Sequence, residues 1–580
     1  MDQPPTTPAT DPRRRFRRTV AAAQRVALLA GSVAFCAGCV SNSAATYDDL
    51  AAEIRAGKDP DMAALRTAFV AAPDYLARLE TISALETQVV RLIGEEPLRL
   101  GPLGSAIVDR NPGSLAGHQA LAAFYSYLDR EDTAARHRGW VSEIRAVIDG
   151  AGSGTAESPL PVISPAEPSA YLVATGRTPV GSMYVPTDRT PFLLRVDATR
   201  GEGRPIENVY FDLETVYNDW LRSAQDEEDD LHAFRVLYSL AERGDAAAQT
   251  LLGSLSLRED RLEHAARLLT RASTGGNLIA HLMLARLYWS KAVGAQVGPD
   301  REGAQRAAAR NYEYGIGLGS DEAMYELGRL YVSGHYGEER REQGLDLLVQ
   351  ASGLENADAC FFLANWFEFD WPDYDRSEKY YLLGANLDDP GAKIGYARFL
   401  MREDVGKQFT DQAYLWLTGL ARNNRRCEDL GVFCAEARIQ LGNLFAKGIH
   451  VRRNYRKARS WLKSAVSASP DHARIVNDVA WTFAVSNLER LRDAPYALQI
   501  MDQVMSSNER ARGTPAYIDT WAAAYAANGD FERAIELQQE ALDHALNGDS
   551  AQQIDDETIE ILREHLQAFE AGRTITDVIP

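Results

Sequence analysis

The feature that most constrains the fold is a pattern of small and bulky residues that recurs through the C-terminal two-thirds of the chain. In the clearest copy, one predicted helix carries Ala323, Leu327-Gly328 and Leu330-Tyr331, and the next carries Gly344-Leu345 and Ala351. Glycine or alanine at one helical position lets a partner helix approach closely, and bulky residues one turn away fill the groove between ridges. A single helix pair cannot bury its apolar faces alone, so neighbouring pairs must stack into a superhelix. The pattern therefore predicts a mainly α fold, a solenoid of helix pairs.

Further copies of this unit occur on both sides of the clearest one. They are centred on Leu252-Gly253, Leu284-Ala285, Leu363-Ala364, Tyr396-Ala397 and Leu441-Gly442. Successive copies lie roughly 32 to 45 residues apart, the period of helical-pair solenoids. Such an array excludes most enzyme folds over this part of the chain.

The units resemble Sel-one-like repeats, a branch of the tetratricopeptide superfamily. Near the C-terminus, Pro515 to Tyr525 followed by Gly529-Asp530-Phe531 and Ala534-Ile535 resembles a standard tetratricopeptide repeat, and Asn477 to Ala497 looks like its degenerate predecessor. The resemblance implies Sel-one-like repeats over 222–470, tetratricopeptide repeats over 471–548 and a capping helix with a tail over 549–580. It also implies a scaffold that presents a concave surface to protein partners, as lipoprotein members do in envelope and exopolysaccharide-secretion machines.

The first 38 residues have the order of a secretory signal. The basic stretch Arg13 to Arg18 precedes an apolar run from Val26 to Cys36, and small residues follow at Ala37-Gly38. The apolar run is about a dozen residues long, whereas a transmembrane helix needs about 20. The sequence thus predicts export, without a permanent membrane span.

The end of this signal, Ala37-Gly38-Cys39, resembles the lipobox of bacterial lipoproteins. The resemblance implies cleavage after Gly38 and lipidation of Cys39, although Cys36 stands where the family prefers leucine. Val40 in place of aspartate after the anchor implies sorting to the outer membrane, with the protein facing the periplasm. An ordinary signal peptidase site and an uncleaved anchor remain alternatives, and both also place the protein outside the cytoplasm.

The net charge narrows the class of partner. The whole chain has a formal charge of −20, and its first 38 residues contain six arginines and two aspartates, so the remainder carries −24. Like charges repel within a Debye length, which excludes nucleic acid and anionic lipid surfaces as partners of the protein body. We expect protein partners in the cell envelope that are basic or neutral.

Residues 39–221 differ in pattern and predict a smaller α+β module. Apolar residues at helical spacing extend to about position 148, and a glycine cluster at Gly150 to Gly154 then ends the helices. Four short strands are expected between about 170 and 213, at Tyr171 to Val173, Ser182 to Val185, Pro191 to Asp197 and Val209 to Leu213.

This module resembles an uncharacterised family of bacterial secreted domains. The shared positions are Tyr47 to Leu50, Asp61 with Leu65-Arg66, His118 with Ala120, Gly150 to Gly154 and Val209 to Asp212. The family brings no assigned activity. His118 is a candidate catalytic base, but a lone histidine in a helical stretch without a cysteine, serine or metal partner is usually a packed structural residue.

Motifs for catalysis, cofactors and metals are missing from the sequence. Apart from Cys36-Ala37-Gly38-Cys39 at the end of the expected signal it contains no Cys-x-x-Cys, and it contains no His-Glu-x-x-His and no Gly-x-Ser-x-Gly. We therefore expect no enzyme activity, no cofactor and no metal. The alternatives to a scaffold are a periplasmic hydrolase or ligand-binding protein that acts through the N-terminal module, and a chaperone-like carrier of exported proteins.

One aromatic stretch in the repeats is a candidate partner-binding surface. It contains Trp366, Phe369, Trp371, Tyr374 and Tyr380, interleaved with acids that include Glu368 and Asp370. Aromatic rings beside acids suit a cationic peptide or a stacked sugar. The alternative is that most of these rings form interhelical core and a loop.

The cysteines beyond the anchor are Cys360, Cys427 and Cys434. Along one helix, residues seven positions apart are about 10 Å apart, too far for a disulfide, but Gly431 suggests a loop in which Cys427 and Cys434 can approach. An oxidising periplasm permits that bond, and two unpaired thiols are the alternative. Cys360 is expected to be a buried apolar residue.

Overall fold

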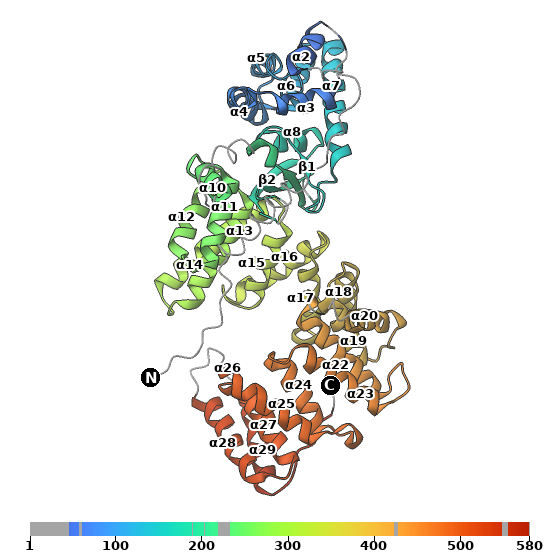
Figure 1. Cartoon of the computed structure of the whole chain (residues 1–580). Coiled ribbons are helices and arrows are strands. Elements are labelled where there is room, and N and C mark those ends of the chain that lie inside the picture. Colours follow the sequence, from blue (N-terminus) through green and yellow to red (C-terminus); the bar gives the residue numbers. More distant parts are fainter. Residues whose placement is uncertain are drawn as a thin grey trace. The chain divides into compact units, whose positions relative to one another are not determined.

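The structure, a computed structural model, describes residues 46–578 except 57, 59–60, 188–189, 202, 218–231, 423–426, 428 and 548–554. The expected signal peptide, Cys39 and the expected boundary at Leu221 lie outside these residues. The chain divides into two compact units, unit 1 (Met1–Leu354) and unit 2 (Glu355–Pro580). Each unit is described separately (Figure 1).

Unit 1 begins with six helices that precede a small sheet. The helices are α2 (Tyr47–Arg55), α3 (Met62–Ala71), α4 (Tyr75–Leu92), α5 (Pro97–Val108), α6 (Leu115–Tyr127) and α7 (Glu131–Ala151). Polar residues start several of them: the Thr46 side chain accepts a hydrogen bond from the backbone N–H of Asp49, and Ser114 accepts one from Gly117. The described residues from Tyr47 to Ala151 are thus mostly helical.

The sheet contains β1 (Leu160–Pro161), β2 (Thr178–Tyr184), β3 (Leu193–Thr199) and β4 (Glu207–Asp212) in the spatial order β1-β4-β3-β2. β1 pairs in parallel with β4, and the other pairs are antiparallel. The expected strand at Tyr171 to Val173 is wrong, because these residues lie in helix α8 (Glu167–Ala174), with Pro168 in its first turn. Tyr171 packs edge-on against Phe211 of β4, so this short apolar run covers the sheet as a helix.

The first repeat helices continue unit 1. They are α10 (His232–Glu242), α11 (Ala246–Arg258), α12 (Leu262–Thr274), α13 (Leu278–Gly294), α14 (Pro299–Gly317), α15 (Asp321–Val332), the 3₁₀ turn η1 (Glu338–Arg340) and α16 (Arg341–Gly353). Figure 1 shows the sheet between the α2–α7 helices and the first of these repeat helices, and α11 and α13 both contact β2. The sheet of the N-terminal module and the first repeats therefore fold as one compact body.

Unit 2 contains the remaining repeats. Its elements are α17 (Ala357–Asn365), the π-helical turn η2 (Trp366–Asp370), α18 (Tyr374–Asn386), α19 (Pro390–Met401), α20 (Asp411–Arg422), α22 (Val432–Lys447), α23 (Tyr455–Ala468), α24 (Ala473–Val485), η3 (Glu489–Leu491), α25 (Ala494–Ser507), α26 (Glu509–Arg512), α27 (Pro515–Ala527), α28 (Phe531–Asn547) and α29 (Asp556–Glu570). After α29 the tail returns to α24, where Asp577 forms a backbone bridge with Ser486. The Trp481 indole N–H donates to the Asp577 carboxylate at 2.9 Å.

The repeated small residues act as predicted, because they bring paired helices into contact. A Cβ atom added at Gly253 would lie 2.7 Å from the Leu269 side chain, and one at Gly328 would lie 2.9 Å from the backbone oxygen of Gly344. Gly442 is packed in the same way against Leu462. The helix-pair fold is confirmed.

A recurrent turn joins successive pairs. In each such turn, a residue with positive φ is followed by an Asp, Asn or Ser whose side chain caps the next helix. The residues that form these turns are Gly244-Asp245, Gly276-Asn277, Gly319-Ser320, Glu355-Asn356 and Asp388-Asp389. The left-handed residue ends one pair, and the cap satisfies the first backbone N–H groups of the next. This turn explains why the repeats begin so sharply.

The cysteines of unit 2 have two different environments. Cys427 and Cys434 form a disulfide with their Cα atoms 5.2 Å apart, and the intervening Gly431 has a positive φ of 54°. The Arg438 guanidinium donates a hydrogen bond to the Cys427 sulfur at 3.3 Å. Cys360 is a buried free thiol, as expected, and burial raises its pKa to about 11.

Two properties of the described part of the chain bear on membranes and metals. None of the helices there is both long enough and apolar enough to cross a bilayer. In the same residues, no cluster of three or more histidine, cysteine or acidic side chains is arranged to hold a metal ion.

Candidate partner-binding site

The candidate site is built where helix α17 widens into the π-helical turn η2. Asn356 caps α17, and the helix continues to Trp366, where the turn begins. The Trp371 N–H donates to the Trp366 oxygen at 2.9 Å and the Asp373 N–H to the Phe367 oxygen at 2.8 Å, which closes the turn. A π-helical turn inserts an extra residue, and such insertions are frequent at functional sites. Here it directs neighbouring side chains to opposite sides of the backbone.

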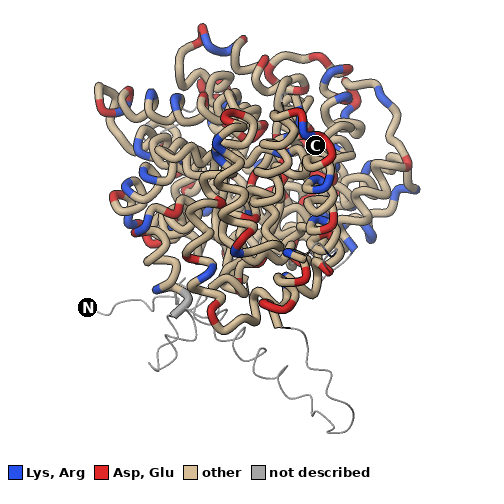
Figure 2. The backbone as a smooth tube through the Cα atoms, turned by 90° about the horizontal axis from the view of Figure 1, so that it is seen from above, with Lys and Arg blue, Asp and Glu red and all other residues tan. Residues whose placement is uncertain are grey.

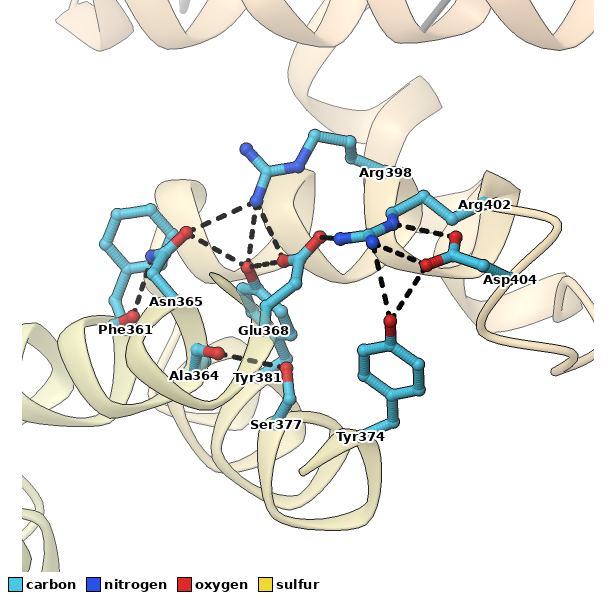
Figure 3. Close-up of polar contacts among 10 residues, drawn as sticks. All are labelled: Phe361, Ala364, Asn365, Glu368, Tyr374, Ser377, Tyr381, Arg398, Arg402 and Asp404. Carbon is cyan, nitrogen blue, oxygen red and sulfur yellow. Dashed lines mark hydrogen bonds and ion pairs between the residues drawn. The ribbon is translucent and has the colours of Figure 1, made fainter. Parts of the chain in front are cut away.

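Glu368 is the side chain that this turn directs inward. The residue is only 2% exposed. Its Oε2 accepts hydrogen bonds from Arg398 at 2.9 Å and from the Tyr381 hydroxyl at 2.5 Å, and its Oε1 accepts one from Arg402 at 2.9 Å (Figure 3). Both carboxylate oxygens are therefore held by cations. A buried carboxylate is tolerated when its charge is paired and its lone pairs are satisfied.

The two arginines come from α19 and the residue that follows it. Figure 3 shows both reaching towards Glu368 from the same side. They stand four positions apart, which places them on one face of a helix. Arg398 also donates to Asn365 at 3.2 Å and to the Tyr381 oxygen at 3.0 Å. Three helices are thus joined through one carboxylate.

A second layer of polar contacts surrounds this centre. Arg402 forms an ion pair with Asp404 at 2.6 Å, and the Tyr374 hydroxyl donates to the same carboxylate at 2.8 Å. The hydrogen bonds from Arg402 and Tyr374 lower the pKa of Asp404 to about 2. Next to them, Lys407 bridges Asp375 and Glu378 at 2.8 and 2.5 Å. Most of the acids in this stretch are therefore already paired within the protein.

Two aromatic side chains face outward from the same turn. Phe369 is 54% exposed and Trp371 is 69% exposed. The guanidinium groups of Arg398 and Arg402 lie over the Phe369 ring, 5.1 and 5.4 Å from its centroid. Cations over an aromatic face are attracted by its quadrupole, so the arginines fix Phe369 as well as Glu368.

The remaining residues of the predicted aromatic surface have other places. Tyr380 is buried, 6% exposed, and stacks on the ring of buried Phe367 at 5.9 Å. Trp366 and Tyr374 are half-buried. The predicted stretch thus contains both core and surface residues, and only Phe369 and Trp371 present a largely open ring.

Arg398 and Arg402 are the functional candidates that the sequence reasoning missed. They lie 30 and 34 residues from Glu368. Their four-residue spacing at the end of a mostly apolar repeat helix was the available signal. The acids, which we expected to attract a cationic peptide, instead bind these two residues and Lys407, so the stretch is not an acidic surface.

His118 lies in the N-terminal module and is enclosed. It is 1% exposed, its Nε2 lies 2.7 Å from the Pro112 oxygen and its Nδ1 lies 3.0 Å from Nδ1 of His137. Because a carbonyl oxygen only accepts, His118 donates through Nε2 and receives a hydrogen bond from His137. Burial lowers the pKa of His118 to about 4. These contacts favour the packed structural role over a catalytic base.

Comparisons with known proteins bear on the fold. No protein-family model matches the chain. No curated protein matches it either. Several solved structures resemble it, all at low identity.

Three of these structures belong to helical-repeat proteins. A protective antigen of uropathogenic Escherichia coli that displays an SLR fold is 14% identical, with a TM-score of 0.41, and the match covers 88% of this chain and 99% of that one. A Sel1 repeat protein from Oxalobacter formigenes is 15% identical, with a TM-score of 0.34 and coverage of 44% and 96%. A TPR protein from Thermus thermophilus is 18% identical, with a TM-score of 0.26 and coverage of 37% and 98%.

Proposed function

We propose that the chain is a helical-repeat scaffold that binds a protein partner through Phe369 and Trp371, and that it works in the bacterial cell envelope on a lipid anchor at Cys39. The observation that carries the proposal is the pair of open aromatic rings on a turn fixed by Glu368 and two arginines. Large aromatic side chains and arginine dominate binding energy at protein interfaces. A rigid anchor also loses little conformational entropy on binding.

The charge distribution supports a partner that is recognised by apolar contacts. Figure 2 shows Lys and Arg interspersed with Asp and Glu along the helices that the structure describes. Near the site, Glu368 and Asp404 balance the two arginines. A partner segment with an apolar or aromatic side chain therefore suits the exposed rings better than a strongly charged one. The same distribution argues against nucleic acid.

Site-specific photo-crosslinking in intact cells tests this surface. A photoreactive amino acid at position 371 should give a discrete crosslinked species, whereas the same substitution at Tyr127, an exposed aromatic residue of unit 1 at 57%, should not. The Phe369→Ala change should weaken crosslinking from position 371, because it removes the neighbouring ring. Equal crosslinking from both positions would contradict a specific site.

Anchoring is tested separately from binding. The Cys39→Ser variant should leave the membrane fraction while its purified form still crosslinks to the same partner from position 371. If the variant stays in the outer membrane, the proposed anchor is wrong.

A further inference from the structure

A hollow of about 260 Å³ lies within unit 1, where the sheet meets the first repeat helices. One wall is formed by β2 and β3, and the opposite wall by the N-terminal end of α11 and the loop before α13. Ligand pockets usually measure roughly 300 to 1,000 Å³, so this one suits a small molecule. It is distant in sequence from the aromatic surface of unit 2 and independent of it.

The hollow is held open by a rigid joint beside it. Asn277, which caps α13, donates through its amide to the backbone oxygen of Ser182 at 2.7 Å and accepts from the Ser182 N–H at 3.3 Å. The amide of a repeat residue thus pairs with the free edge of strand β2. A Cβ atom at Gly181 would lie 3.1 Å from the Ile279 nitrogen, so the strand and the helix already touch there. The walls are fixed without any ligand.

The walls of the hollow carry both polar and apolar side chains. The hydroxyls of Tyr184 and Tyr217 lie 3.1 Å apart, and both residues line the hollow together with Asp245. Apolar walls come from residues such as Leu194 and Val196. Among the described residues that line it, Asp245 is the single charged side chain. The hollow therefore combines apolar walls with one carboxylate and two phenol groups.

Asp245 has capacity for a further contact. As the cap of α11 it accepts a hydrogen bond from the Ala248 N–H at 2.7 Å, and the Ala247 N–H also contributes. A carboxylate offers about four acceptor positions. Burial raises the pKa of Asp245, and burial together with the charge of Asp245 raises the pKa of Tyr184 and of Tyr217, all three of which line the hollow. Among the described residues of the lining, none carries a positive charge that would balance this carboxylate.

From the single carboxylate, the tyrosine rings and the apolar walls we infer that this hollow binds a small organic cation, a molecule with an ammonium group on an apolar body. The ammonium group would donate to Asp245 and lie near the two phenol groups. The apolar body would lie against Leu194 and Val196. An anion of the same size would meet the unbalanced charge of Asp245 and be excluded.

Isothermal titration calorimetry on the full chain tests the inference with three probes of matched shape. Benzylamine is cationic at pH 7, benzyl alcohol is neutral and benzoate is anionic. We expect benzylamine to bind at least tenfold more tightly than benzyl alcohol, and benzoate to give no heat of binding. Similar affinities for the amine and the alcohol, or no binding of the amine at millimolar concentration, would overturn the inference.

Substitution of the carboxylate locates the site. Asp245→Asn removes the charge but keeps a side chain that caps a helix equally well, so the fold should be retained. It should weaken benzylamine binding at least tenfold, and Asp245→Ser, which also caps, should do the same. The matched control is Asp389→Asn, the same change at the cap of α19 in unit 2, where binding should be unaffected. If Asp245→Asn leaves the affinity unchanged, the amine does not bind in this hollow.

Discussion

Two buried glutamates, one in each unit, are kept in the interior in different ways. Glu86 of α4 is 3% exposed and receives a hydrogen bond from the Ser114 hydroxyl at 2.6 Å. Arg66, whose charge also acts on Glu86, is bound to Glu167 at 2.5 and 3.0 Å. Glu368 is buried to the same degree but is bound by two arginines. One carboxyl is accommodated by hydroxyl groups and the other by charge.

The difference teaches what each site can do. Burial raises the pKa of Glu86 to about 7, and the hydrogen bonds from Ser114 and Ser164 only partly oppose it, so this carboxyl gains a proton near neutral pH. Glu368, in the turn η2 that follows α17, is instead ion-paired with Arg398 and Arg402 of α19 and its cap, which also lie over the Phe369 ring, and it is hydrogen-bonded to Tyr381 of α18. The first arrangement makes the module sensitive to pH, and the second displays a rigid surface.

The largest effect should follow from removing the cations around Glu368. In the double variant Arg398→Met and Arg402→Met, the carboxylate stays buried without a cation and keeps only the hydrogen bond from Tyr381, and we expect the opening free energy of α17–α19 to fall by about 3–5 kcal/mol. Hydrogen exchange of peptides from these helices measures it. Adding Glu368→Gln should recover part of the loss because the charge is then gone. Unchanged exchange in the double variant would show that the ion pairs contribute little.

Glu86 should give the next largest effect, and one that depends on pH. In the unfolded chain its pKa is about 4.5 and in the folded chain about 7, so the folded state holds the proton between these values. The stability is therefore complete below about pH 4.5 and is lost as the pH rises through 7, by about 3 kcal/mol in total. Glu86→Gln should remove this slope and stabilise the module at pH 8.

The control for this effect is a group with the opposite slope. The pKa of His118 falls from 6.5 to about 4 on folding, so its contribution is present above pH 6.5 and is lost as the pH falls through 4. In the Glu86→Gln variant, hydrogen exchange of α4 and α6 should therefore retain an acid-side loss of stability, while the loss between about pH 4.5 and 7 disappears. A variant that keeps the neutral slope would assign it to another group.

The sequence predicted those parts of the fold that depend on neighbours along the chain. The close approach at Gly253 and Gly328 follows from residues within one helix pair, and the pattern contains both partners. The failure at Tyr171 to Val173 also has a local cause: three apolar residues fit a buried strand or one face of a helix equally well. Only packing against Phe211, 40 positions away, decides between them.

The site itself could be predicted only in part. Composition drew attention to Phe369 and Trp371, but their exposure depends on the π-helical turn, which has no signature in a single sequence. Glu368 is indistinguishable in sequence from its exposed neighbour Asp370. The partners that bury it come from another helix pair, at separations of 30 and 34 residues. Contacts between pairs are set by how the pairs stack, which the repeat pattern leaves undetermined.

Asn277, an uncharged residue that joins a repeat helix to strand β2 in unit 1, extends the comparison. Asn277→Ala removes a helix cap and two hydrogen bonds to the edge of β2, so we expect the opening free energy of β2 to fall by about 2–3 kcal/mol. Asn454→Ala, a cap of α23 that accepts only from Lys457, should destabilise its own helix by about 1 kcal/mol. Hydrogen exchange of both segments gives the two values. Equal losses would mean that the contacts with the strand add nothing.

The smallest effect on stability should come from the most exposed ring. Trp371 is 69% exposed and the described contacts place its ring against no other aromatic group, so Trp371→Ala should change the opening free energy of unit 2 by less than about 0.5 kcal/mol. The same change should remove most partner crosslinking from a photoreactive residue at position 369. This separation distinguishes a binding residue from a structural one. Changes at Glu368 or at its two arginines should instead reduce the stability of the helices and the partner crosslinking together. If Trp371→Ala destabilises the helices as much as the arginine changes do, the Trp371 ring belongs to the core, and the proposal that it is an exposed binding residue is wrong.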